Sequence, residues 1–131
     1  MVVVDTSIWS AFFRRKGISS DPRLEKLKSL ICENKAVLLG MVKQELLSGI
    51  REEVRFKKLL EALSGFLPLL ATEEDHILAA RFYNMCRSEG IQGSFNDFLI
   101  CAQSVNLQME LFTNDKDFEH YQKVLPIKLI N

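Results

Sequence analysis

The sequence predicts a single α/β domain with a central, mostly parallel sheet of four to five strands flanked by helices. Short apolar runs alternate with longer amphipathic runs along the chain, and a repeated strand–helix order implies a parallel sheet. The chain has 131 residues, 47% of them hydrophobic, which suits one core and one domain, residues 1–131. It contains no repeat and no linker rich in Gly, Pro or Ser, so no internal boundary is expected.

The first elements follow from β-branching and capping. Residues 2–4 are three valines, which is typical of a strand buried on both faces of a sheet. Asp5 or Thr6 can cap the next helix, which is expected to run to about Lys16. Asp21 before Pro22 is typical of an N-cap followed by proline at the first helical position. The remaining elements of this half are a helix to about residue 34, a strand at 36–40, and helices at 42–50 and 54–63.

The second half begins with an apolar run interrupted by proline. Residues 66–70 are expected to form an edge strand, because Pro68 cannot donate a hydrogen bond to a neighbouring strand. Thr72 can cap a long helix that ends near Ser88 before Gly90, and Ser94 can cap the next, at residues 95–105. A strand at 109–112, a short helix at 116–121 and a strand at 126–130 complete the fold.

Composition limits the cellular location and the kinds of binding partner that are expected. The N-terminus lacks the pattern of a secretory signal, and no run approaches the roughly 18 apolar residues of a membrane span. The three cysteines are widely spaced inside apolar stretches, which favours free thiols and a cytoplasmic location. Seventeen basic and seventeen acidic residues give a net charge of zero. This balance argues against a protein that coats nucleic acid by charge alone, but it leaves a nuclease possible.

Four acidic residues are expected at the same edge of the sheet. Asp5 and Asp115 follow predicted strands, and Glu45 and Asp97 lie in the first turns of helices. Sites in open parallel sheets lie outside the carboxyl ends of the strands. Carboxylates gathered there would suit Mg²⁺ or Mn²⁺, which prefer oxygen ligands, and such ions can activate water and stabilise a phosphoryl displacement.

Each acid alone has a simpler interpretation. Asp5 could cap a helix, Asp97 could form half of a capping box with Ser94, and Glu45 could be a solvated helix residue. Asp97, however, begins an almost wholly apolar helix, where a charge near the core needs a partner or a cation. The four acids together therefore favour a metal site.

Four short motifs stand out along the chain: VDTSIW at residues 4–9, QELLSG at 44–49, NDFLICAQ at 96–103 and LFTNDKDF at 111–118. They resemble the motifs of PIN-domain proteins, in a form close to VapC-type toxins, and their order and spacing agree over the whole chain. Cysteine stands at position 101 where a small alanine is usual in that family, which bears on packing.

The resemblance implies a single PIN-like domain and a Mg²⁺- or Mn²⁺-dependent endoribonuclease, the toxin of a VapBC-type pair. It implies an RNA substrate, a cognate antitoxin as partner and a homodimer. Asp5, Glu45, Asp97 and Asp115 match the catalytic acids, with Asp5, Asp97 and Asp115 holding the metal. Thr6 and Thr113 match supporting hydroxyl positions. Asp117 is read as surface charge with a supporting role, although the fourth acid could be either Asp115 or Asp117.

Two other functions are possible. A phosphohydrolase or phosphotransfer domain could use a strand-end aspartate as nucleophile, although Ser7 stands where haloacid-dehalogenase-like enzymes carry a second aspartate. A non-catalytic PIN-like binding module is the other. We interpret His76 and His120 as structural or solvated. Three aromatic side chains that could stack on bases are instead expected in the core or at a partner interface: Trp9, Phe12 and Phe13.

Overall fold

The computed structural model describes residues 1–14 and 21–130. Within them, β2, β1, β3 and β4 form a sheet in that order, and all three pairings are parallel. The predicted α/β class with a parallel sheet is thus confirmed. The strands are β1 (Val2–Val4), β2 (Ala36–Val37), β3 (Glu110–Phe112) and β4 (Leu129–Ile130).

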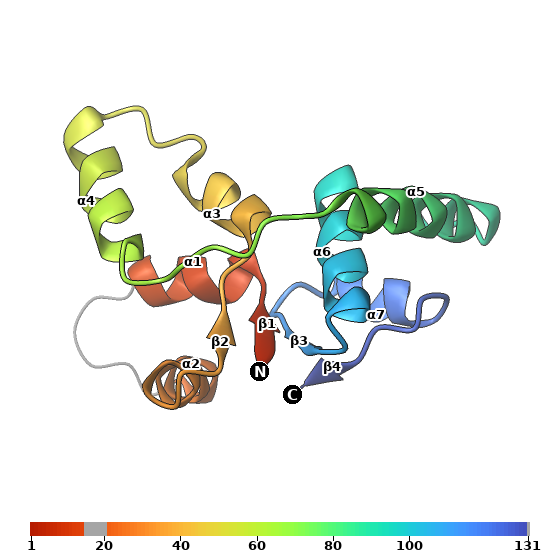
Figure 1. The fold of residues 1–131 in the computed structure, drawn as a ribbon, viewed down its shortest axis with the longest axis horizontal. Coiled ribbons are helices and arrows are strands. Elements are labelled where there is room, and N and C mark those ends of the chain that lie inside the picture. The colour runs from red at the N-terminus through yellow and green to blue at the C-terminus, as the bar shows by residue number, and fades with distance from the viewer. Residues whose placement is uncertain (15–20, 131) are drawn as a thin grey trace.

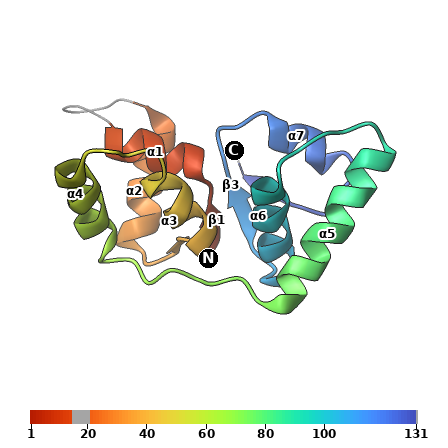
Figure 2. The ribbon, with the colours of Figure 1, turned by 90° about the horizontal axis from the view of Figure 1, so that it is seen from above.

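The flanking helices fall into two groups. Helices α1 to α4 lie in the left half of Figure 1 and α5 to α7 in the right half, and the segment before α5 crosses between them. Figure 2 shows α5 running alongside α6. The helices are α1 (Thr6–Arg14), α2 (Pro22–Cys32), α3 (Gly40–Leu47), α4 (Glu53–Leu63), α5 (Glu73–Ser88), α6 (Phe95–Asn106) and α7 (Asp117–Gln122).

Helix α5 begins at a capping box that also fastens it to α6. The Thr72 side chain accepts a hydrogen bond from the Asp75 amide, and the Asp75 carboxylate accepts one from the Thr72 amide at 2.8 Å. Asn106 of α6 donates a further bond to Asp75 at 2.8 Å. Burial acts to raise the pKa of Asp75, but these hydrogen bonds outweigh it and the pKa is lowered. Asp75 therefore holds α5 against α6 as a charged group.

The hydrophobic core lies between the sheet and the helices. Every residue of α6 from Phe98 to Ser104 is buried, as the apolar run after Asp97 predicts. Trp9 is fully buried and stacks on Phe13, so the prediction of a core position holds for Trp9. Because α6 is enclosed, the acid at its first turn is held at the edge of the core.

Several boundaries differ from those expected. The strand predicted at 36–40 ends at Val37, since Gly40 already begins α3. The run at 66–70 contributes a single parallel bridge between Leu69 and Leu39 rather than a strand. Cys32 is exposed and does not pack as a core residue. The predicted helix end at Lys16 lies outside the described residues. Across the described part of the chain, no helix meets the length and apolarity needed to span a membrane.

Candidate functional site

Two neighbouring strands bring Asp5 and the 113–115 segment side by side. Val4 is in register with Phe112, and the Asp5 amide donates to the Phe112 carbonyl at 2.8 Å. The next residue on each strand therefore emerges at the same edge of the sheet. This is the arrangement predicted from strands that end in acids.

The Asp5 carboxylate is held by hydroxyl groups. Thr113 Oγ1 donates to Asp5 Oδ2 at 2.7 Å and Ser7 Oγ donates to the same oxygen at 2.9 Å. Ser7 Oγ in turn accepts from the Asn114 amide at 2.9 Å, and Thr113 Oγ1 accepts from the Asp115 amide at 3.0 Å. Asp5, only 4% exposed, thus organises the loop after β3. Sequence reasoning missed Ser7; the signal was a small hydroxyl residue two positions after a strand-end aspartate.

Glu45 reaches the same region from α3. Thr6 Oγ1 donates to Glu45 Oε1 at 2.9 Å, which joins the start of α1 to α3. The charge of Glu45 acts on Asp97, so the two carboxylates are close enough to repel. The predicted supporting residues Thr6 and Thr113 therefore each donate to a predicted site acid.

The pKa of Asp97 is strongly raised by its surroundings. Burial raises its pKa to about 6, and the charges of Asp5, Asp115 and Glu45 add to the increase. A hydrogen bond of 2.7 Å from the Tyr121 hydroxyl opposes this change. Burial and the bond to Asp97 also raise the pKa of Tyr121, so the tyrosine stays a neutral donor. Tyr121 is buried, and sequence reasoning did not include it among the site residues.

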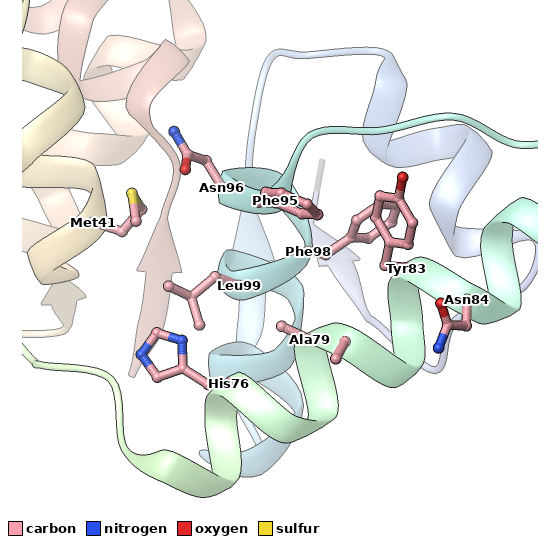
Figure 3. Close-up of a pocket in the computed structure, with 10 residues that line it drawn as sticks. Met41, His76, Ala79, Tyr83, Asn84, Phe95, Asn96, Phe98 and Leu99 are labelled. Atoms are coloured by element: carbon pink, nitrogen blue, oxygen red, sulfur yellow. The ribbon is translucent and has the colours of Figure 1, made fainter.

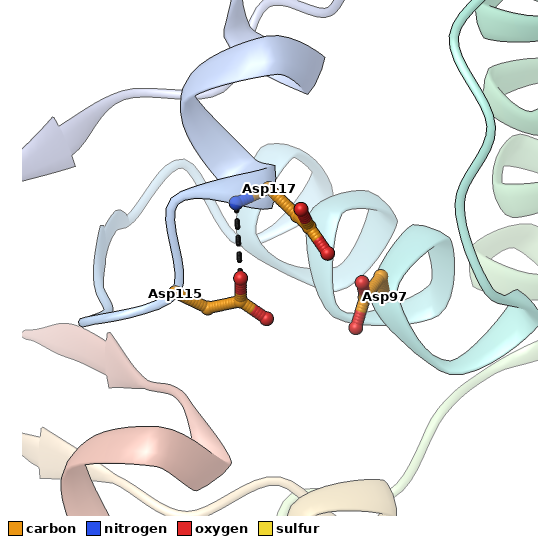
Figure 4. A group of neighbouring side chains, drawn as sticks. All are labelled: Asp97, Asp115 and Asp117. Atoms are coloured by element: carbon orange, nitrogen blue, oxygen red, sulfur yellow. Dashed lines mark hydrogen bonds between the residues drawn. The ribbon is translucent and has the colours of Figure 1, made fainter.

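The tightest group of carboxylates includes Asp117. Within the described residues, Asp97, Asp115 and Asp117 each offer an oxygen within 4.8 Å of the other two. Figure 4 shows the three carboxylates pointing toward one another, and the Asp117 amide donates to Asp115 Oδ1 at 2.9 Å. Asp117 is exposed, as expected of surface charge, but it lies next to the two acids predicted for the site. Asp5 lies outside this group of three.

Aromatic packing fixes the Tyr121 hydroxyl. The rings of Phe98 and Tyr121 are 5.0 Å apart, and Tyr83 packs edge-on against Phe98 at 5.8 Å. Gly93 lies against them, and a Cβ at this position would come within 2.6 Å of the Tyr121 hydroxyl and 2.7 Å of Phe98 Cζ. Only glycine leaves room for both rings in these positions.

An apolar pocket of about 390 Å³ lies between α5 and α6. Figure 3 shows Tyr83 and Phe95 grouped at one end, and His76 beside Leu99. None of the predicted acids lines the pocket, and its wall contains no carboxylate among the described residues. The exposed His76 belongs to this pocket, while His120 lines a small hollow with Asp117 and Tyr121.

The acid cluster fits a divalent cation. Several carboxylates face one space, and none of them takes part in a salt bridge among residues 1–14 and 21–130. Burial raises the pKa of Asp97, and the charges of the neighbouring acids raise it further, beyond what the hydrogen bond from Tyr121 offsets. A cation such as Mg²⁺ or Mn²⁺ would neutralise this charge and lower that pKa.

Comparison with known proteins gives one family. The PIN domain matches residues 2–124. The chain is 30% identical over 125 residues to Ribonuclease VapC11 of Mycobacterium tuberculosis, an alignment that covers 91% of this chain and 90% of the relative.

Solved structures show the same fold. VapBC2 from Rickettsia felis, bound to a DNA fragment from its promoter, superposes with a TM-score of 0.81 at 18% identity, covering 100% of this chain and 98% of that one. FitAcB from Neisseria gonorrhoeae gives a TM-score of 0.78 at 20% identity, with 100% and 97% covered. At these sequence identities, the similarity to the solved structures shows the fold alone.

A Gly93→Ala substitution tests the support of Tyr121. The added methyl group must displace the Tyr121 and Phe98 rings, so we expect the free energy of unfolding to fall by about 1–3 kcal/mol and the Tyr121–Asp97 hydrogen bond to be lost. Chemical denaturation measures the first effect. Gly65→Ala is the matched control, because nothing lies within 4 Å of a Cβ there. Equal stability of the two variants would contradict this role of Gly93.

Proposed function

The chain belongs to the PIN-domain family, and we propose that it is a metal-dependent endoribonuclease that acts as the toxin of a VapBC-type toxin–antitoxin pair. The ribonuclease name of the M. tuberculosis relative supports the activity. The observation that carries the proposal is the convergence of Asp5, Glu45, Asp97 and Asp115 at one sheet edge, with Asp97 perturbed by the other three.

Mg²⁺ or Mn²⁺ is the proposed cofactor. Asp97 and Asp115 belong both to the set expected from the sequence and to the tightest group in the structure, so we assign them as ligands. Asp5, expected from sequence, or Asp117, favoured by geometry, would supply the third carboxylate. When bound, the ion lowers the pKa of water and neutralises charge on the phosphate.

The protein's own groups position the reaction. The hydroxyls of Ser7 and Thr113 hold the Asp5 carboxylate still, and the Thr113–Asp115 bond sets the direction of the loop that carries Asp115. Thr6 occupies Oε1 of Glu45, which orients the other oxygen to accept a hydrogen bond from water. Tyr121 keeps Asp97 facing the cluster. The groups that must bind a cation and water are thereby preorganised.

The alternatives receive less support. A nucleophilic aspartate must reach the phosphorus atom, but Asp5 is 4% exposed and two hydroxyls occupy one of its oxygens. A non-catalytic binding module gains nothing from several acids that repel one another.

An Asp97→Asn variant tests the activity. Asparagine can keep the bond from Tyr121 but lacks the charge that binds the cation, so RNA cleavage in Mn²⁺ should fall at least about 100-fold. The metal-free variant should remain folded, since burial disfavours the charge that is removed. Cleavage of labelled RNA by the purified protein, with circular dichroism as a folding check, measures both effects.

Asp117→Asn, assayed in parallel, is the comparison. We expect it to retain more activity than Asp97→Asn, because Asp117 is exposed and Asp97 is the acid that the resemblance and the geometry both place in the metal site. Wild-type cleavage rates in Asp97→Asn would contradict the proposed metal site.

We place the antitoxin partner in the groove between α1 and α4. A groove of about 300 Å³ there has apolar residues Phe13, Ile50 and Leu59 and the cations Arg55 and Lys58. An amphipathic helix with acidic residues along one edge would complement it. The homodimer implied by the resemblance and the cytoplasmic location favoured by the cysteines are part of the same proposal.

Expression in a bacterial host tests the toxin role. The wild-type protein alone should arrest growth, Asp5→Ala should not, and co-expression of the cognate antitoxin should restore growth. Lys58→Glu in the groove should keep toxicity but lose rescue, whereas Lys57→Glu, exposed on the same helix, should keep both. Equal growth with wild-type protein and Asp5→Ala at matched protein levels would rule out the toxin role.

A further inference from the structure

A second pocket, of about 240 Å³, adjoins the acid cluster on the side of Asp115. Its apolar lining comes from β3 and β4, and its polar lining includes Arg23 of α2, Lys116 and Glu119, together with Asn114 and Asp115. We propose that Arg23 and Lys116 bind a backbone phosphate of the RNA strand beside the scissile bond. The inference rests on the proposed ribonuclease activity.

A site built of carboxylates needs cations nearby to hold RNA. The acid cluster repels phosphate, and the chain has no net charge, so attraction must come from local cations. Arg23 and Lys116 are exposed, and neither enters a salt bridge in the part of the chain that the structure describes. Of the two acids in the wall, Asp115 would be neutralised by the metal. The pocket then has two cations against Glu119 alone.

The other hollows do not offer this combination. The hollow beside Asp117 is lined by neutral residues, Asp117 and His120, with neither lysine nor arginine. The groove between α1 and α4 has cations but none of the clustered acids in its wall. Of the described pockets, the one at Asp115 therefore places cations next to a proposed metal ligand.

The two cations suit a phosphate in different ways. The guanidinium of Arg23 can donate two parallel hydrogen bonds to phosphate oxygens, while the ammonium of Lys116 acts as a point charge. Arg23 lies in α2 and Lys116 directly before α7, so the two cations come from parts of the chain that are far apart in the sequence. A phosphate held between them would fix the strand relative to Asp115 without reading a base.

Binding of a short single-stranded RNA tests the proposal. Fluorescence anisotropy with a hydrolysis-resistant, phosphorothioate-linked strand measures Kd without cleavage on an otherwise wild-type protein in Mn²⁺, over a series of salt concentrations. Arg23→Gln and Lys116→Gln should each weaken binding about tenfold. Each should also reduce the slope of log K against log salt by about 0.7, the value for one phosphate contact with a single strand. Lys26→Gln on α2 and Lys123→Gln after α7, both exposed, are matched controls of the same charge change.

The outcomes separate this proposal from the activity on which it rests. Loss of affinity and slope in the pocket variants, with both controls unchanged, supports the phosphate site. If the pocket variants bind like the controls while wild-type protein cleaves RNA, the phosphate site is wrong and the nuclease stands. If wild-type protein neither cleaves RNA nor binds the hydrolysis-resistant strand, the proposed function fails and the phosphate site fails with it.

Discussion

Repulsion among carboxylates at one edge of a parallel sheet is the constraint on which the rest of the site depends. Asp97 lies close enough to Asp5, Glu45 and Asp115 for each to raise its pKa, in addition to the effect of burial. Such an arrangement destabilises the metal-free protein unless the surrounding structure holds it. The acids are kept in place by the register of the sheet, the buried helix α6 and the hydroxyl groups that bond to Asp5. A bound cation would reduce the repulsion between them.

The support is divided between two halves of the molecule. On the sheet side, Ser7 and Thr113 donate to Asp5 and tie the loop after β3 to the start of α1. On the helical side, the capping box at Thr72 and the bond from Asn106 to Asp75 fix α5 against α6, and Tyr121 orients Asp97. The cluster is therefore formed where two rigid parts of the fold meet.

The sequence could predict the acids at the strand ends, because residues that directly follow parallel strands lie at the same edge of the sheet. Asp5 after a valine run and Asp115 after β3 needed no knowledge of side-chain packing. Tyr121 could not be found this way, since its bond to Asp97 depends on how α7 packs against α6.

Local backbone geometry explains the other differences. Asp117 turns toward the cluster because its amide bonds back to Asp115, a turn that spacing does not reveal. The need for glycine at position 93 appears only when the rings around it are placed. The strand expected at 66–70 is reduced to a bridge at Leu69, beside Leu39.

The central claim is that these carboxylates form a divalent metal site. Anomalous diffraction from crystals soaked in Mn²⁺ tests it most directly, because the signal locates the ion without reference to activity. The account predicts a peak within coordination distance of both Asp97 and Asp115, and the same map decides between Asp5 and Asp117 as the third carboxylate. A peak elsewhere, or no peak while the crystals stay intact at millimolar Mn²⁺, would contradict it.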